Sequence, residues 1–535
     1  MTQAKQPTNT GALATLVIVF FFWGFIAASN SIFIPFCKTH FHLNQFQSQL
    51  IGSAFYGAYF IGSLILFLIS NSLKYDILNR IGYKKGIIYG LWISVVGALL
   101  IIPSANANSF PAILASFFVV ALGFSLQQTC AQPFAILLGD PSTGSHRLNL
   151  GGGVNSFGTT LGPIIVSFFL FGSVGGEHKN VTVTNINNLY LIVAGVFAAV
   201  ALFFTFSKLP SGKNEEKFEL ANKAAKSLLI MTGVIIAIII VGQLTEIHKL
   251  PLLLVTLACI IFILFSSNSS AVKNNDGWGA MKYQQLIFGM IGIFVYVGVE
   301  VTIDNNFGAL LKSPGYLTDL GLDESKISKY ISLYWGSLMI GRWTGAVSVF
   351  NLSKSARKIA TIIVPFVAFA VILTANRING NDVSDLYAYA ICIVIAIAAF
   401  FYGQEKPVKT LFTVSVLASV AMVVGLLTHG IVSVYAFMAG GLFCSVMWPC
   451  IFSLGVGGLG KYTSQGSAFL IMMILGGAVI PPLQGSLGDI HDIGFHDSYI
   501  VAAICFAFLA WLSLKLKSVL HAQGLDFDQQ IGGGH

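Results

Sequence analysis

The sequence predicts an all-α polytopic membrane protein, and three observations support that prediction. Of its 535 residues, 55% are hydrophobic and only 9% are charged, whereas a soluble domain carries about 25% charged residues. The mean hydropathy of the chain is +0.80. Apolar runs long enough to cross a bilayer as helices recur from one end of the chain to the other.

Sixteen apolar runs of roughly 17 to 25 residues are predicted to span the membrane. They lie at about 12–36, 48–73, 83–104, 110–134, 149–173, 188–207, 226–245, 250–266, 285–311, 327–350, 357–375, 385–402, 409–428, 430–456, 464–488 and 498–516. With the amino terminus inside, 21 Lys and Arg residues fall in cytoplasmic segments, 7 fall outside, and Arg342 lies in a span. Because cytoplasmic loops carry the positive excess, both termini are predicted to be cytoplasmic.

The charge and cysteine patterns exclude several other classes. The formal charge of +8 comes from residues spread over short loops rather than from one basic patch, so nucleic-acid binding is not expected. The seven cysteines include no CxxC pair, which argues against a disulfide framework or a metal site. The first apolar run is longer than the core of a signal peptide, so the first helix is expected to be retained.

An internal repeat indicates two related halves. A proline followed six residues later by a glycine occurs twice, and the next span in each case holds a glycine-rich stretch that ends in proline. The matching pieces are Gln132-Pro133 to Leu138-Gly139 with Trp448-Pro449 to Leu454-Gly455, and Gly151-Gly152-Gly153 to Pro163 with Gly476-Gly477 to Pro481. Such residues let helices bend or approach closely, as a moving pathway requires, although ordinary helix packing is the alternative for any one glycine.

Two pairs of nearly featureless apolar runs, 226–266 and 357–402, each return the chain to the side from which it started. They predict two extra transmembrane hairpins, facing lipid or another copy, added to a twelve-helix core. The predicted division is a six-helix bundle at 1–208, a linker with a hairpin at 209–284, the first two helices of a second bundle at 285–356, a hairpin at 357–406, the remaining four helices at 407–520 and a tail at 521–535.

Two acids lie inside the apolar run 286–311. An isolated acid at the bilayer centre costs roughly 2.5 to 3.5 kcal/mol on insertion scales, so Glu300 and Asp304 are expected to face a cavity or a partner. Their i, i+4 spacing places them on one helix face. Glu300 is the candidate coupling residue, as a proton carrier or as a Na⁺ ligand beside Thr302, and Asp304 can share that role or hold a sugar hydroxyl. The alternative is a structural acid paired with Arg342 or with an amide.

Amide and hydroxyl side chains at similar depths in several spans suit a polyol. One amide can bridge two sugar hydroxyls, because it offers both a donor and an acceptor, and aromatic rings can cover the apolar face of a sugar. The amino-terminal half has no deep cationic residue, which disfavours an anionic substrate. Hydrogen bonding between helices is the alternative for any single amide. The candidate substrate-binding residues are Asn30, Ser31, Gln127, Gln128, Gln132, Asn155, Asp304, Asn305 and Trp448.

Arg342 stands in the sequence Gly341-Arg342-Trp343-Thr344-Gly345, near the end of a predicted span. Three basic residues, Lys354, Arg357 and Lys358, follow within a short distance along the chain. Arg342 is therefore predicted to be a gating or packing residue at the cytoplasmic side.

Several stretches together resemble the fucose and glucose/galactose permease branch of the major facilitator superfamily. They are Phe41–Phe60, Arg147–Leu150 with Asn155–Gly158, Tyr296–Gly298, Gly341–Gly345, and Ile451–Gly455 through Gly477. The resemblance implies a major facilitator fold of two six-helix bundles around a central sugar site that works by alternating access. At the positions where the family's fucose–proton symporter carries two acids, this chain has Ser31 and Gln128, which cannot exchange a proton. The glucose/galactose branch is more similar and includes Na⁺-coupled members.

We therefore predict cation-coupled import of a neutral hexose such as glucose or galactose, with Na⁺ favoured over H⁺ and Glu300 as a Na⁺ ligand. The alternatives are a proton-coupled fucose-type symporter, an uncoupled facilitator and an exporter of another neutral solute. An enzyme is not expected, because the loops are short and poor in nucleophiles, bases and metal ligands. The expected partners are the sugar, the cation and the lipid bilayer, and the resemblance together with the compact loops points to a bacterial inner membrane.

Overall fold

The computed structural model describes residues 7–43, 45–171, 182–212, 219–245, 249–313, 316, 327–350, 352–403 and 406–525. The first half of the chain forms α1 (Thr10–His40), α2 (Gln45–Leu73), α3 (Ile77–Ile81), α4 (Tyr83–Asn106), α5 (Phe110–Leu137), α6 (Gly144–Phe171), α7 (Val183–Phe206), α8 (Asn222–Leu244) and α9 (Lys249–Lys273). The second half forms α10 (Gln284–Leu311), α11 (Ile327–Ala346), α12 (Lys354–Ile378), α13 (Ala390–Gly403), α14 (Pro407–Leu427), α15 (Gly430–Cys444), α16 (Met447–Val456), α17 (Thr463–Met472), α18 (Gly476–Gly488), α19 (Gly494–Ser498) and α20 (Ile500–Ala522).

The prediction of an all-α membrane protein is confirmed: within the ranges given above there are helices and no strands. Thirteen helices of those ranges are long and apolar enough to cross a membrane. Each predicted span overlaps a helix. In their described residues, α6 and α11 are not among the thirteen, and α1 includes the apolar stretch Thr10–Ile26. The total of sixteen spans, and the interpretation of α8–α9 and α12–α13 as extra hairpins, stay predictions.

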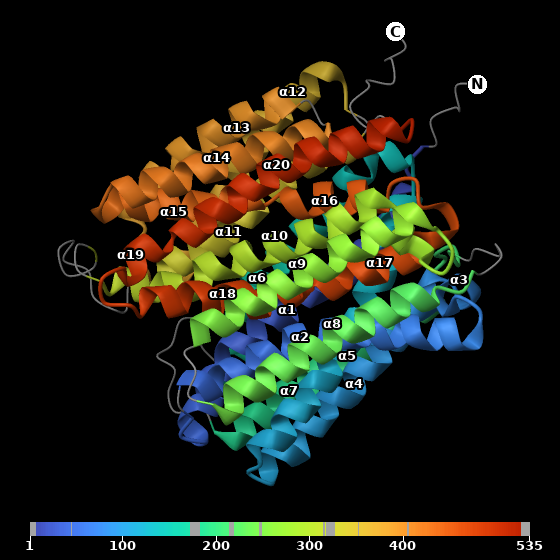
Figure 1. The fold of residues 1–535 in the computed structure, drawn as a ribbon. Coiled ribbons are helices and arrows are strands. Elements are labelled where there is room, and N and C mark those ends of the chain that lie inside the picture. Colours follow the sequence, from blue (N-terminus) through green and yellow to red (C-terminus); the bar gives the residue numbers. More distant parts are fainter. Residues whose placement is uncertain are drawn as a thin grey trace.

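The long helices pack in two sets (Figure 1). In the first set, α4 packs against α5 and α7, α1 packs against α6, and α2 packs against α5. In the second set, α10 packs against α16, α18 and α20, and α14 packs against α15 and α20. The apolar window of α10 is 94% buried, compared with 28% in α8 and 22% in α9. The helix that carries the two acids is therefore the most enclosed of these three.

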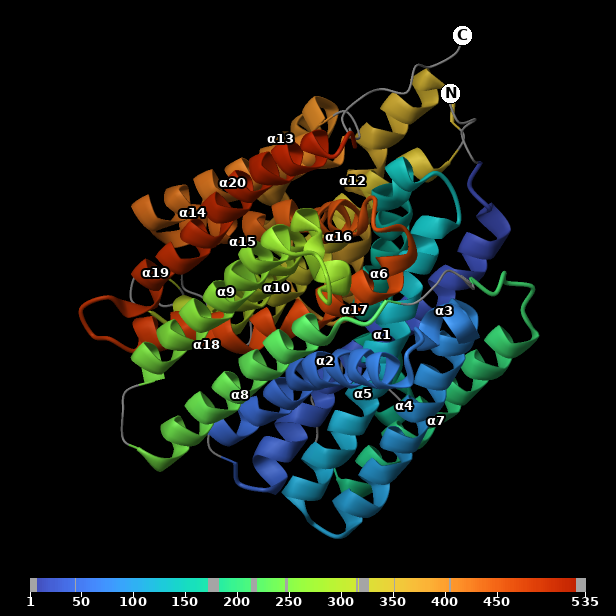
Figure 2. The same ribbon diagram turned by 45° about the vertical axis from the view of Figure 1, so that its right-hand side comes forward.

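The pair α8–α9 lies along the junction of the two sets, as Figure 2 shows. Helix α9 packs against α10 and α18 of the second set, whereas α8 contacts α2 of the first set. Near the start of α8, the Asn71 side chain accepts a hydrogen bond from the Ala221 backbone at 2.8 Å and donates one to Asn222 at 2.8 Å. The α12–α13 pair packs on α11 and α14 on the other side of the second set.

The glycine-rich repeat marks two close helix crossings. A Cβ atom on Gly158 of α6 would collide with the backbone carbonyl of Phe21 in α1, and one on Gly476 at the start of α18 would collide with the backbone carbonyl of Phe294 in α10. The crossing of α6 with α1 thus has a counterpart in the crossing of α18 with α10. In both places glycine lets two backbones touch.

We expect Gly476→Val to destabilise the protein by about 1–3 kcal/mol or more, because added atoms in a packed interior force neighbouring helices apart. Gly195→Val in α7 is the matched control, because nothing lies within 4 Å of a Cβ atom at that exposed position. Thermal unfolding of the two purified variants in detergent measures the difference. Equal melting temperatures would contradict the close crossing.

Candidate functional site

A central cavity of about 210 Å³ lies between the two sets of helices. Helices α1, α2, α5 and α6 of the first set and α10, α11 and α16 of the second set supply its walls, together with Ile474 between α17 and α18. The lining residues are Phe20, Trp23, Phe55, Tyr56, Tyr59, Gln128, Gln132, Leu148, Gly152, Asn155, Tyr296, Val297, Glu300, Val301, Trp335, Arg342, Trp448, Pro449 and Ile474. Both sets would therefore touch a solute in this cavity.

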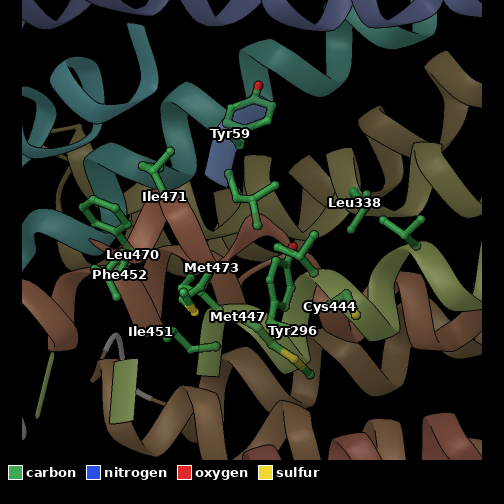
Figure 3. Close-up of a cluster of buried hydrophobic side chains, with 14 of the residues drawn as sticks. Tyr59, Tyr296, Leu338, Cys444, Met447, Ile451, Phe452, Leu470, Ile471 and Met473 are labelled. Carbon is green, nitrogen blue, oxygen red and sulfur yellow. The ribbon is translucent and has the colours of Figure 1, made fainter. Parts of the chain in front are cut away.

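Aromatic side chains form much of the cavity wall. Tyr296 and Trp448 lie with ring centroids 6.1 Å apart on the side of the second set, and Phe55 packs edge-on against Tyr59 at 5.1 Å on the opposite side. Figure 3 shows Tyr296 surrounded by buried apolar side chains that include Cys444 and Met447. These neighbours restrict the Tyr296 ring, so its hydroxyl has a defined position at the cavity wall.

An ion pair lies in the cavity wall. Arg342 Nη2 is 3.3 Å from Glu300 Oε1, and the Tyr296 hydroxyl donates to the same oxygen at 2.7 Å. The two charged side chains are only 13% and 11% exposed. Arg342 also donates from Nη1 to the Ser156 hydroxyl of α6 at 3.0 Å, which connects the two sets of helices. The pair has no net charge, so the cavity suits a neutral solute.

The repeated prolines explain two contacts of this region. Proline has no N–H, so Pro449 cannot donate to the carbonyl of Ser445, four residues earlier in the chain. Arg342 Nε takes over and donates to that carbonyl at 3.2 Å. In the first half, Pro133 likewise leaves the Thr129 carbonyl without its helical donor, and the Ser467 hydroxyl of α17 donates to it at 2.9 Å. Pro133 and Pro449 thus each leave a carbonyl that accepts from a side chain of another helix.

The Arg342 side chain extends into the central cavity. The residue lies in the last turns of α11, but the side chains of a helix lean toward its N-terminus. The long Arg342 side chain therefore reaches back to the cavity and to Glu300 rather than to Lys354, Arg357 and Lys358. Its contact with Ser156 is compatible with a gating role, which stays a prediction. The pairing of Glu300 with Arg342, given above as an alternative, is what the structure shows.

The predicted amides have different surroundings. Gln128, Gln132, Asn155 and Trp448 line the cavity. Gln127 does not, because it is fully buried between helices, where it accepts from Trp23 Nε1 at 2.7 Å and donates to Ser94 at 3.1 Å.

The amides in the wall differ in how far they are already paired. Gln128 donates to the Tyr59 hydroxyl at 2.9 Å, and Asn155 donates to the Phe20 carbonyl at 3.1 Å. Among the described residues, no group hydrogen-bonds the Gln132 side chain, which leaves this amide available to a solute.

Three other predicted residues do not line the cavity. Asn305 is exposed, because it lies one residue, about 100° of helical turn, beyond Asp304. Thr302 is fully buried, and its hydroxyl has no hydrogen-bond partner in the described structure. Asp304 is only partly exposed, and its Oδ1 atom is buried. The side chains of Asn30 and Ser31 lie outside the described residues.

Tyr56, Tyr59 and Trp335 were not among the predicted site residues, although all three line the cavity. The i, i+3 spacing of Tyr56 and Tyr59 on α2 is a weak signal for a shared face. Trp335 had no comparable signal, because a single aromatic residue in an apolar span is usually packing.

Hydrogen bonds join the two sets at the end of the bundle where α1 begins and α20 ends (Figure 1). Trp343 Nε1 donates to the Gly153 carbonyl at 3.0 Å, and the Ser464 hydroxyl donates to Asp76 at 3.0 Å. Asn79 donates to the Lys461 carbonyl at 3.2 Å. These contacts hold α6 to α11, and the α2–α4 connection to the start of α17.

Apolar membrane helices that enclose a polar, aromatic-walled cavity are typical of membrane transporters. The sequence model of the Major Facilitator Superfamily matches residues 15–404 of this chain. A glucose/galactose transporter of Brucella abortus is 30% identical over 96% of this chain and 96% of its own length. The L-fucose-proton symporter of Escherichia coli is 23% identical over 92% of this chain and 90% of its own length.

The crystal structure of the Escherichia coli fucose:proton symporter shares the fold. It aligns with a TM-score of 0.63 at 20% identity and covers 94% of this chain and 98% of the symporter. The chain is a multi-pass integral membrane protein of the Major Facilitator Superfamily and belongs to its fucose and glucose/galactose permease family.

Proposed function

We propose that this protein imports a neutral hexose such as glucose or galactose together with a cation, by alternating access to the central cavity. The cavity supports this proposal most directly: aromatic rings, uncharged amides and a neutralised ion pair enclose about 210 Å³. Aromatic faces and a few oriented polar groups are the means by which proteins bind such solutes. The names of the relatives, glucose/galactose transporter and L-fucose-proton symporter, support the same substrate class.

The proposed mechanism is a rocking of the two sets of helices about the cavity. The predicted division into bundles at 1–208 and at 285–356 with 407–520 supplies the moving bodies, and the α8–α9 and α12–α13 hairpins are proposed to stay with the second. The Trp343–Gly153 and Ser464–Asp76 hydrogen bonds would break when the cavity opens at the end of the bundle where α1 begins and α20 ends. Arg342 would lose Ser156 in the same movement. Both termini are proposed to face the cytoplasm of a bacterium, across its inner membrane.

The coupling cation is proposed to bind at an acid of α10. The sequence favoured Na⁺, whereas relatives named as proton symporters support H⁺ equally. A cation drives uphill import only if one state binds it more tightly, and such coupling is typically worth about 1–3 kcal/mol.

Uptake into proteoliposomes tests the proposal. We expect radiolabelled glucose or galactose to accumulate when an inward Na⁺ gradient or an inward H⁺ gradient is imposed, and to equilibrate without accumulation when neither is present. L-Fucose is measured in parallel as the competing substrate. Equilibration without accumulation under both gradients would show a facilitator, and absence of uptake of all three sugars would overturn the proposal.

A further inference from the structure

The two acids of α10 have different surroundings, although they share one helix face. Glu300 lines the cavity and is committed to Arg342 and Tyr296 at 3.3 and 2.7 Å. Asp304 lies one turn farther along α10, outside the cavity lining. No described cation pairs with it, and its buried Oδ1 atom has no hydrogen-bond partner. A buried carboxylate oxygen without a partner is costly and requires an explanation, such as a bound ion.

Two tyrosines lie near Asp304, but their hydroxyls form hydrogen bonds with other groups. Tyr334 of α11 and Tyr499 of α20 are close enough to interact electrostatically with the Asp304 carboxylate. Their hydroxyls donate instead to the backbone carbonyls of Glu300 at 2.7 Å and of Ile303 at 3.0 Å. Among the described residues, Tyr56 of α2 and Glu300 also interact electrostatically with Asp304. The environment thus fixes the backbone of α10 around Asp304 and leaves one carboxylate oxygen available.

Trp335 connects Asp304 to the cavity. Its side chain lines the cavity wall and is close enough to act on the Asp304 carboxylate. Trp335 also packs edge-on against Tyr334, with ring centroids 5.8 Å apart. A sugar that stacks on the cavity face of this indole would therefore shift a side chain that lies close to Asp304.

We propose that Asp304 is the carboxylate that takes the coupling cation, and that Trp335 is the positioning residue that links its occupancy to the sugar. The inference rests on the proposed symport and assigns its ion step to one residue. Glu300 then forms part of the cavity wall and does not bind the cation, since its charge is already neutralised by Arg342. The cation is a proton or a monovalent metal ion. A proton-coupled protein accumulates sugar under the H⁺ gradient, and a Na⁺-coupled one accumulates sugar under the Na⁺ gradient.

The test compares full-length variants in proteoliposomes by two assays. Sugar exchange at equal concentrations requires binding and alternating access, whereas accumulation also requires the cation. For Asp304→Asn we expect exchange close to the wild-type rate and accumulation lowered about 5- to 150-fold, the usual range of such coupling. Asp304→Glu should recover part of the accumulation. Asp489→Asn, the same change at an exposed acid at the end of α18, should leave both assays unchanged.

Trp335→Phe keeps a ring in the cavity wall and removes only the N–H donor. We expect it to bind sugar within a few-fold of wild type while its sugar affinity responds less to Na⁺ or to pH, whichever drives the wild type. Wild-type accumulation by Asp304→Asn would overturn the inference, as would equal losses of exchange and accumulation in that variant. A wild-type protein that transports no hexose would overturn the proposed function itself, and the inference with it.

Discussion

Replacing Arg342 with glutamine is expected to destabilise the protein by about 3–5 kcal/mol, the usual result of removing one partner from a buried ion pair. The Glu300 carboxylate would keep the Tyr296 hydroxyl but lose its only observed cation among the described residues. The Ser445 carbonyl, which Pro449 leaves without a helical donor, would lose Arg342 as well. Thermal and denaturant unfolding of the purified protein in detergent measures the change.

A double variant separates the charge effect from the packing effect. Arg342→Gln combined with Glu300→Gln has no unpaired charge in the cavity wall, so we expect it to recover most of the stability lost by Arg342→Gln alone. Lys358→Gln removes a positive charge from an exposed position of α12 and should change stability by no more than about 0.5 kcal/mol. An Arg342→Gln variant as stable as Lys358→Gln would show that the ion pair does not form.

Replacing Gln132 with leucine is expected to weaken hexose binding about tenfold, since a lost amide can forfeit two hydrogen bonds of about 0.5–1.5 kcal/mol each. The Gln132 side chain lines the cavity and forms no hydrogen bond with the described part of the chain. The stability of the Gln132→Leu variant should stay close to wild type, because no internal hydrogen bond is broken. Calorimetric sugar binding together with thermal unfolding measures both quantities.

Gln127→Leu is the matched variant, five residues earlier on the same helix. Gln127 connects Trp23 to Ser94 by hydrogen bonds and lies outside the cavity, so its replacement leaves a buried indole N–H unpaired. We expect the melting temperature to fall and the hexose affinity to change less than in Gln132→Leu. If Gln127→Leu remained stable and weakened hexose binding more than Gln132→Leu, then Gln127 rather than Gln132 would be the amide that binds the sugar.

Sequence patterns determined the membrane class, the helical fold and the family of this protein. Composition and the lengths of the apolar runs give the class, because a bilayer admits few structures and requires about 20 apolar residues for each helical span. The polar stretch of α10 also followed from the sequence, since acids inside an apolar run are too costly to face lipid. The proline and glycine repeat gave the positions where helices cross closely.

Only the tertiary structure decided which polar residues share one cavity. Gln127 and Gln128 are neighbours in the chain, yet one lies between helices and the other in the cavity wall, because adjacent residues of a helix point about 100° apart. Arg342 reaches Glu300 through its long side chain and the packing of α11 on α10, which no local pattern records. The link from Trp335 to Asp304 likewise depends on how two helices meet, and helix packing is a property of the whole fold.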